Sequence, residues 1–139
     1  MAKAGKAKMI YIFIWKASTL ECLAVLNKFH LRAVRSLSFS PSGNRLLSVG
    51  EDDFHSVAVW DWANKAMLCN AKVDPDKVFD VTWLKDDTEF ATVGMKHVKF
   101  FTVSGSNLAP NKGLYGPGGP QATISCCYAF GTTLVAGTP

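Results

Sequence analysis

Acidic side chains are the first candidates for chemistry in this 139-residue chain. Asp74, Asp76 and Asp80 have the close spacing that is typical of a calcium-binding loop. In such a loop the sixth residue is glycine and the twelfth is glutamate, whereas those positions here hold Phe79 and Lys85. We therefore reject a calcium site in this segment.

The four cysteines, Cys22, Cys69, Cys126 and Cys127, are the next candidates. No two of them have C-x-x-C spacing, and no paired histidines accompany them, so a zinc site is not expected. The adjacent Cys126 and Cys127 would point to opposite faces of a strand. We expect free cysteines that pack as small apolar side chains in a reducing compartment, and we predict no bound metal.

The sequence also lacks the common signatures of phosphate binding and acyl transfer. The glycine-rich segment 116–120 contains two prolines, which have no amide N–H, and no Lys-Ser or Lys-Thr follows it. Gly-x-Ser-x-Gly is absent, and no Ser/His/Asp group is indicated apart from the structural set described below. We predict that the protein is not an enzyme and binds no cofactor.

Basic residues suggest a surface for an acidic partner. Lys3, Lys6 and Lys8 account for most of the net charge of +4, and they lie in a segment, 1–8, that we predict to be a flexible tail. Five further basic residues form a loose candidate surface for an acidic protein tail: Arg32, Arg35, Lys77, Lys96 and Lys99. Basic and aromatic residues alternate near Lys99, but we expect a solvated strand face there and no binding of nucleic acid.

Two apolar stretches are candidates for a membrane or export signal. The run 9–15 is only seven residues long, is followed at once by Lys16, and lacks a convincing cleavage site. Residues 113–139 contain no charge, but Gly, Pro, Thr, Ser and Gln interrupt them throughout. We predict neither a signal peptide nor a membrane helix, and we expect no membrane partner and a cytoplasmic location.

An internal repeat indicates the elements that position these residues. Segment 34–50, VRSLSFSPSGNRLLSVG, aligns with segment 78–94, VFDVTWLKDDTEFATVG, at an offset of 44 residues. Each contains two strand-like stretches of alternating apolar residues around a turn such as Pro41-Ser42-Gly43-Asn44. A period of about 40–45 residues built from strands is typical of propeller blades.

We therefore predict an all-β fold that is part of a propeller, with two full four-stranded blades and flanking half-blades. After the tail at 1–8, residues 9–139 divide into four units: the back half of a blade (9–30), a blade (31–73), a blade with a long connection at 104–120 (74–120), and the start of a further blade (121–139). Complete propellers need about four to eight blades. We expect the chain alone to be poorly soluble or oligomeric, and to be stable within a longer protein or among partners.

The segment Val57-Ala58-Val59-Trp60-Asp61 resembles the Trp-Asp ending of a WD repeat. WD repeats contain a hydrogen-bonded set of His, Ser or Thr, Asp and Trp that joins neighbouring strands, because buried imidazole and indole N–H groups need partners. By position, the resemblance assigns that structural set to His30, Ser48, Asp53 (with Asp52 as the alternative) and Trp60. The second repeat keeps only Thr92, and Phe101 replaces its tryptophan.

Longer strings are similar to the echinoderm microtubule-associated protein-like family. They are KFH at 28–30, LSVGEDDFHS at 47–56, VWDW at 59–62 and TVGMKHVKF at 92–100, and the resemblance covers about residues 10–137. It implies a non-catalytic module of the cytoskeleton, cilium or axoneme that binds tubulin, microtubules or axonemal proteins, with the remaining blades supplied by a longer chain or by partner subunits. The alternative is a general WD-repeat scaffold of a multiprotein complex without microtubules.

Overall fold

Every regular element of the described residues, 8–131 and 133–139, is a β-strand in this computed structural model. In chain order the strands are β1 (Ile12–Lys16), β2 (Glu21–Leu26), β3 (Val34–Phe39), β4 (Arg45–Gly50), β5 (Val57–Asp61), β6 (Ala66–Ala71), β7 (Val78–Trp83), β8 (Glu89–Gly94), β9 (His97–Ser104), β10 (Asn107–Lys112), β11 (Ser125–Phe130) and β12 (Thr133–Gly137). No helix in this part of the chain is long and apolar enough to cross a membrane.

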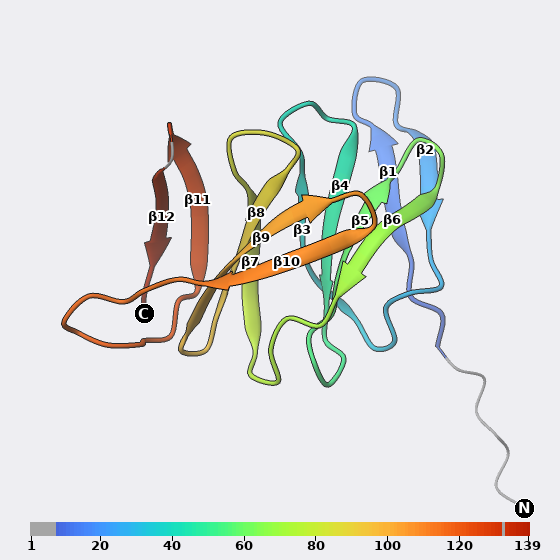
Figure 1. Ribbon diagram of the computed structural model, residues 1–139. Helices are drawn as coiled ribbons and strands as arrows, with labels where there is room; N and C mark the ends of the chain where they lie inside the picture. Colours follow the sequence, from blue (N-terminus) through green and yellow to red (C-terminus); the bar gives the residue numbers. More distant parts are fainter. Residues whose placement is uncertain (1–7, 132) are drawn as a thin grey trace, which may run out of the picture.

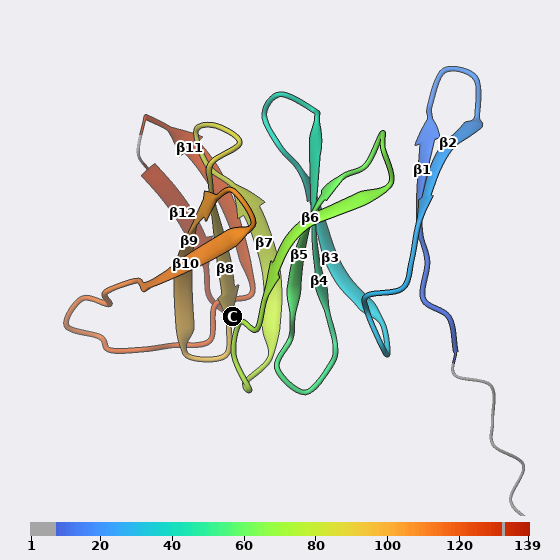
Figure 2. The same cartoon turned by 45° about the vertical axis from the view of Figure 1, so that its right-hand side comes forward.

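The strands form four units that follow one another side by side (Figures 1 and 2). Two are antiparallel four-stranded sheets, the first blade (β3–β6) and the second blade (β7–β10), each with its strands in sequence order. The others are two-stranded units, the N-terminal hairpin (β1–β2) and the C-terminal hairpin (β11–β12). The predicted all-β partial propeller is confirmed.

The repeat seen in the sequence corresponds to a repeat in strand register. In the first blade Val34 pairs with Gly50, and in the second blade Val78 pairs with Gly94. Each first strand has a register shift directly after that valine. The tight turn between β3 and β4 contains Gly43 at φ 78°, a backbone conformation that glycine adopts without steric cost. The 44-residue period therefore specifies backbone geometry as well as composition.

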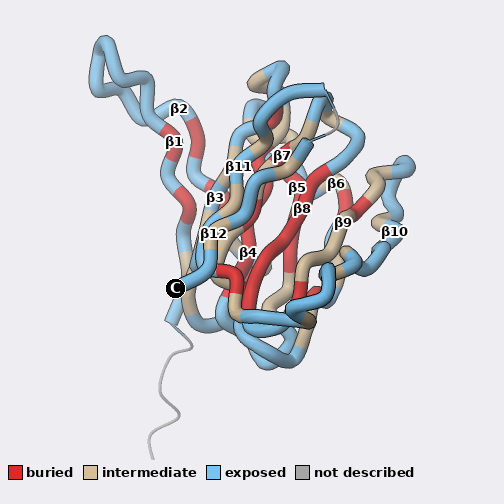
Figure 3. Tube along the Cα trace, turned by 90° about the vertical axis from the view of Figure 1, so that its left-hand side faces the viewer, coloured by how far each residue is buried: buried red, intermediate tan, exposed pale blue. Residues whose placement is uncertain are grey.

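A hydrophobic core lies between the two blades. β4, β5 and β6 contribute Leu47, Val49, Val57, Val59 and Cys69, and the second blade contributes Val78, Val81, Trp83, Phe90 and Phe101. Figure 3 shows buried positions along the middle strands of the blades and exposed hairpin turns around them. Burial of one such large apolar side chain contributes about 1.5–3 kcal/mol, so this interface is a main source of stability.

Each hairpin is attached to one blade. The N-terminal hairpin packs the buried Ile12, Ile14 and Leu26 against Leu46 and Trp60 of the first blade. The C-terminal hairpin lies beside β7, where the backbone N–H of Cys126 donates to the Asp80 carboxylate at 3.1 Å. The other oxygen of that carboxylate accepts a bond from the Ser36 hydroxyl at 2.9 Å. Asp80 thus links β3, β7 and β11, the first strands of three successive units.

The segment 104–120 differs from its prediction as a long connection, because it contains β10. A turn at Gly105, with φ 59°, brings Asn107–Lys112 back along β9. β10 is the last strand in its sheet, an edge position where Pro110 is tolerated because one side of the strand needs no N–H donor. The Gly, Pro and Asn content that indicated a loop is therefore compatible with an edge strand.

Candidate functional site

Three side chains of the WD-type set meet between β4, β5 and the loop before β3. The Trp60 indole N–H donates to the Ser48 hydroxyl oxygen at 2.9 Å. The same hydroxyl lies 2.7 Å from Nε2 of His30, and all three residues are buried. Ser48 therefore joins the loop at His30 to strands β4 and β5 through one hydroxyl group.

The protonation state of His30 follows from this geometry. Burial lowers the pKa of His30 to about 4, although the nearby Asp52 charge opposes the shift, so the ring is neutral at pH 7. The Ser48 oxygen has two lone pairs and one proton, so beside the bond from Trp60 it can either donate to Nε2 or accept from it, whereas Nδ1 has no hydrogen-bond partner among the described residues. Nδ1 faces Gly50, where an added Cβ would lie only 2.3 Å away. Glycine is thus required beside the imidazole.

Asp53, which the sequence analysis assigned to this set, does not join it. Its side chain is 75% exposed and pairs with Arg32 at 2.7 Å. Asp52 points into the β4–β5 loop instead and accepts bonds from the backbone N–H groups of Phe54 and Ser56. The backbone turns the Asp52 side chain into the loop and the Asp53 side chain toward solvent, a difference that two identical residue types do not reveal.

The ionised form of the Asp52 carboxylate stabilises this loop. Burial disfavours its charge, but the hydrogen bonds from Phe54 and Ser56, together with His30, outweigh that effect and lower the pKa of Asp52 below its ordinary value. The Ser56 hydroxyl also donates to it at 3.0 Å. Asp52 therefore orders the loop between β4 and β5. Its interaction with His30 is electrostatic, with no direct hydrogen bond between the two side chains.

The second blade replaces this set with a charged cluster that sequence comparison missed. Thr92 corresponds to Ser48, but its buried hydroxyl has no partner among the described residues, and Phe101 supplies no N–H. At the position equivalent to His30 stands Asp74, which pairs with Lys99 at 2.7 Å and lies 3.8 Å from Nδ1 of His97. The sequence gives one signal of this cluster: the 44-residue offset aligns Asp74 with His30.

The expected exposure of Lys99 is wrong. Its side chain is only 14% exposed, and Nζ donates to the Asp74 carboxylate and to the Val73 carbonyl. β9 lies between β8 and β10 in its sheet, and the side chain of Lys99 meets the segment before β7. The alternation of side chains along β9 therefore does not place Lys99 in solvent. Lys99 is consequently not part of a free basic surface.

Burial also determines the charge states of this cluster. Burial opposes ionisation of Asp74, but bonds from Lys99 and from the Asp76 N–H, together with the nearby His97, lower its pKa below the ordinary value. Burial lowers the pKa of His97, although Asp74 and the Met95 carbonyl oppose the shift. His97 Nδ1 lies 3.2 Å from the Met95 carbonyl, and His55 Nδ1 lies 2.9 Å from the Asp74 carbonyl. Each of these two histidines thus lies within hydrogen-bond distance of a loop carbonyl group.

The remaining basic candidates gather at one end of the sheets, the lower end in Figure 1, where the β2–β3, β4–β5, β6–β7 and β8–β9 loops lie. Arg32, Arg35 and Lys77 line a hollow of about 420 Å³ together with Glu51 and Asp53. Arg32 pairs with Asp53 at 2.7 Å, and Arg35 approaches Glu51 at 3.4 Å. The two arginines are therefore partly neutralised.

Three of the candidate lysines are exposed and form no ion pair in the described part of the chain. Lys77 precedes β7, Lys96 occupies the β8–β9 turn at φ 59°, and Lys8 precedes β1. Lys3 and Lys6 lie outside the described residues. The candidate surface thus centres on Lys77 and Lys96, with Lys8 near the same end of the sheets.

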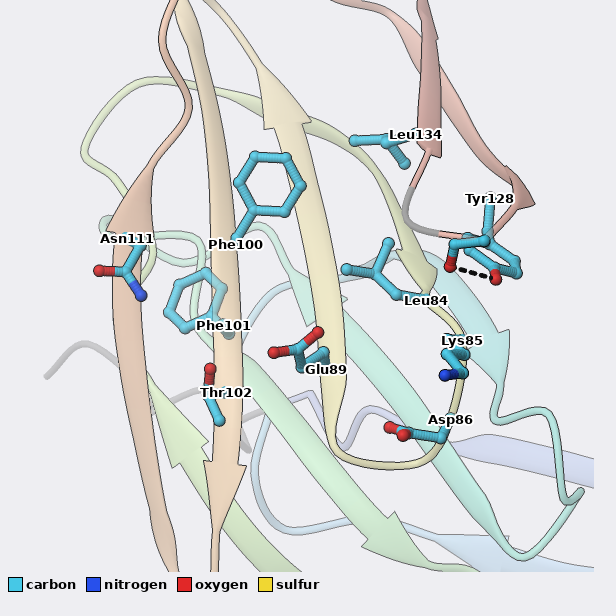
Figure 4. Close-up of a pocket in the computed structure, with 11 residues that line it drawn as sticks. Leu84, Lys85, Asp86, Glu89, Phe100, Phe101, Thr102, Asn111, Tyr128 and Leu134 are labelled. Atoms are coloured by element: carbon cyan, nitrogen blue, oxygen red, sulfur yellow. Dashed lines mark hydrogen bonds between the residues drawn. The ribbon is translucent and has the colours of Figure 1, made fainter.

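A second hollow, of about 310 Å³, separates the second blade from the C-terminal hairpin (Figure 4). Phe100 of β9 and Leu134 of β12 lie on its two sides, and Glu89 and Asp86 lie at its lower end. In residues 8–131 and 133–139, no group of three or more His, Cys, Asp or Glu side chains could hold a metal ion. The hollow offers an apolar surface for packing rather than a set of ligands.

Comparison with known proteins identifies relatives of nearly the whole chain. The sequence model of the first β-propeller of the echinoderm microtubule-associated proteins matches residues 1–138. Human echinoderm microtubule-associated protein-like 1 is 34% identical over 118 residues, which are 82% of this chain and 14% of that protein. The 77 kDa echinoderm microtubule-associated protein of Lytechinus variegatus is 33% identical over 109 residues, which are 76% of this chain and 16% of that protein.

A solved structure shows the same fold at lower sequence similarity. The β-propeller domain of Cps50 (Swd1) from Myceliophteria thermophila superposes with a TM-score of 0.63 at 18% identity, covering 73% of this chain and 32% of that one. The fold is thus that of a WD-type propeller. The chain spans less than a fifth of the length of the curated relatives it matches and about a third of that solved domain.

Proposed function

The chain belongs to the echinoderm microtubule-associated protein-like family, and from that premise we propose that it is a non-catalytic module that binds the tubulin lattice through its propeller surface. The match over residues 1–138 is the observation that supports this proposal most directly. The relatives are named as microtubule-associated proteins, and their match spans most of this chain. The proposed site of action is the microtubule cytoskeleton.

The charge distribution supports the choice of surface. Lys77 and Lys96 are exposed at the same end of the sheets, and each ammonium group is available to an acidic partner. Lys8 adds a further positive charge near that end, before β1. Complementary surface charge accelerates encounter and favours an acidic protein tail over a neutral one. We assign binding of acidic tubulin tails to this end of the sheets.

The rest of the propeller belongs to the proposal as well. The matched segments cover 14% and 16% of the relatives. We propose that the units 9–30, 31–73, 74–120 and 121–139 are successive parts of a ring, whose other blades come from a longer chain or from partner subunits. The tail at 1–8 precedes this ring segment.

Co-sedimentation with taxane-stabilised microtubules tests the binding, and charge reversal tests the surface. The test variant combines Lys77→Glu with Lys96→Glu. The matched control combines Lys16→Glu with Lys65→Glu, which lie at the opposite end of the sheets. Lys65, like Lys96, is an exposed turn residue with positive φ, 55° against 59°.

We expect the test variant to bind at least about tenfold more weakly, since each reversal removes an attraction and adds a repulsion of up to about 1 kcal/mol. The control should bind as the parent does, and removal of the acidic tubulin tails should weaken the parent. Equal loss in both variants would reject the assigned surface. No pelleting of the parent protein would favour the alternative, a WD-repeat scaffold of another complex.

A further inference from the structure

An apolar hollow lies at the same end of the sheets as the basic candidates. It has a volume of about 300 Å³ and is lined by residues of the β2–β3, β4–β5 and β6–β7 loops. Three of its lining side chains are large and apolar: Phe29, Leu31 and Phe54. Phe29 packs edge-on against the buried Trp60, with ring centroids 6.4 Å apart, whereas Leu31 and Phe54 are 75% and 45% exposed. The hollow therefore presents two exposed apolar side chains beside a packed aromatic ring.

The backbone around Phe54 is held in place. Its N–H donates to the Asp52 carboxylate at 3.1 Å, and its carbonyl accepts the N–H groups of Val73 and Asp74, each at 3.1 Å. The next residue, His55, has φ 48°, and its Nδ1 lies 2.9 Å from the Asp74 carbonyl. An exposed aromatic side chain on a fixed backbone loses little conformational freedom when a partner binds. Phe54 is thus preorganised as a contact residue.

The available charge beside this hollow is positive. Lys72 is exposed, its Nζ lies 4.3 Å from the centroid of the Phe54 ring, and it forms no ion pair among the described residues. The two carboxylates that line the hollow are engaged within the chain. Asp52 accepts the bonds of the β4–β5 loop, and Asp53 pairs with Arg32 at 2.7 Å. A partner therefore meets an available ammonium group next to an apolar surface.

The hollow of about 420 Å³ beside Lys77 adjoins this one. The two hollows share three lining residues: Arg32, Asp52 and Asp53. In the larger hollow Lys77 is exposed without an ion pair among the described residues, and the Arg35 guanidinium lies 5.6 Å from the centroid of the Phe79 ring. The contact of Arg35 with Glu51 is long, 3.4 Å, and half-exposed, and such surface pairs are weak. The apolar surface thus continues into a surface with further available positive charge.

We propose that these two adjoining hollows bind an acidic peptide segment that carries an apolar side chain. The apolar side chain enters the smaller hollow between Leu31 and Phe54, where its burial is favourable. Flanking carboxylates meet the ammonium groups of Lys72 and Lys77, which complement their charge. A purely acidic segment makes only the second contact and a neutral segment only the first, so the combination selects among partners. Because it specifies what the surface recognises in an acidic partner, this site rests on the proposed function.

Fluorescence anisotropy with labelled synthetic peptides and the 139-residue chain tests the site without microtubules. The probe is the peptide EEEFEEE, and the controls are EEEAEEE, which lacks the apolar side chain, and KKKFKKK, which reverses the charge. EEEFEEE should bind at least about fivefold more tightly than either control, the loss expected when a buried interface side chain is truncated. Its affinity should decrease as salt is added, since the lysines are exposed.

Single substitutions separate the apolar contact from the charged one. Leu31→Ser should weaken binding of EEEFEEE at least about fivefold and leave EEEAEEE unchanged. The matched control is Leu20→Ser, an 81% exposed leucine in the β1–β2 turn at the opposite end of the sheets, which should bind as the parent does. Lys72→Gln should weaken both acidic peptides, whereas Lys65→Gln, at an exposed turn residue between β5 and β6, should weaken neither. All four side chains are exposed, so urea unfolding should show that each variant is folded.

Equal affinity for EEEFEEE and EEEAEEE, or equal losses in Leu31→Ser and Leu20→Ser, would overturn the proposal. A parent that is dimeric by light scattering and becomes monomeric in Leu31→Ser would assign the hollow to a second copy of the chain and would also overturn it. Failure of the proposed function is a separate result. A chain that binds EEEFEEE with the expected losses but does not pellet with microtubules would support the peptide site and reject tubulin as its partner.

Discussion

Replacement of Ser48 by alanine tests whether one hydroxyl group holds the first blade together. The Ser48 oxygen accepts the indole N–H of Trp60 at 2.9 Å and lies 2.7 Å from Nε2 of His30. Its residue is fully buried at 0% exposure, so water cannot replace the lost contacts without entering the interior. Thr92 is the matched control, because it has the equivalent position in the second blade and its buried hydroxyl has no partner in the described residues.

The two hydroxyl groups should therefore have opposite effects on stability. Ser48→Ala leaves two buried polar groups unpaired, and each such group costs about 1–3 kcal/mol, so we expect a loss of about 2–6 kcal/mol. At about 2–4 °C per kcal/mol, Tm should fall by about 4–24 °C. Thr92→Val replaces an unpaired buried hydroxyl by a methyl group of the same shape and should stabilise the protein by about 1 kcal/mol.

Urea unfolding followed by tryptophan fluorescence measures both changes, with the slope of the transition as a check that the cooperative unit is unchanged. The reasoning is refuted if the two substitutions shift the midpoint in the same direction by similar amounts. That result would mean that the hydrogen bonds of Ser48 with His30 and Trp60 add nothing to the free energy of unfolding beyond the packing of the Ser48 side chain.

Three further predictions concern the same blade. Gly50→Ala should lower Tm, because its Cβ would lie 2.3 Å from Nδ1 of His30, and thermal unfolding of the Gly50→Ala/His30→Ala double variant should show a smaller loss than the two single changes added together. Asp52→Asn should cost about 1–2 kcal/mol in urea unfolding, because the carboxylate accepts bonds from Phe54 and Ser56, whereas Asp53→Asn at the exposed neighbour should change stability by less than about 0.5 kcal/mol. Equal effects at the two aspartates would contradict the assignment of Asp52. The pKa of His30 is about 4 in the folded chain against an ordinary 6.5, so between these values the unfolded chain binds a proton that the folded chain does not, and the urea midpoint should fall as pH decreases from 6.5 to 4. A His30→Gln variant should lose part of this decline, and an unchanged pH profile in that variant would contradict the assignment.

The repeat in the sequence was sufficient to predict the blades, because strand alternation and turn residues recur at a fixed offset. The resemblance to a WD repeat led to His30, Ser48 and Trp60. It could not separate Asp52 from Asp53, since the two residues are identical and only the direction of the backbone places one inside the loop. The structure resolves this by hydrogen bonds from Phe54 and Ser56.

Two other features depended on neighbours that the sequence does not reveal. Lys99 was expected to be solvated because alternate residues of a strand face opposite sides, but both faces of this strand meet other parts of the chain. β10 was expected to be a loop because it contains Pro110 and asparagines, and it forms a strand because its position at the edge of a sheet tolerates a missing N–H. In both cases the environment of the strand, rather than its composition, determined the outcome.

Co-sedimentation of the 139-residue chain with taxane-stabilised microtubules is the most direct test of the proposed function. The account predicts saturable pelleting with intact microtubules, weaker pelleting after the acidic tubulin tails are cleaved, and weaker pelleting of the Lys77→Glu/Lys96→Glu variant than of the Lys16→Glu/Lys65→Glu control. A folded protein that stays in the supernatant at micromolar concentration of both components would contradict it.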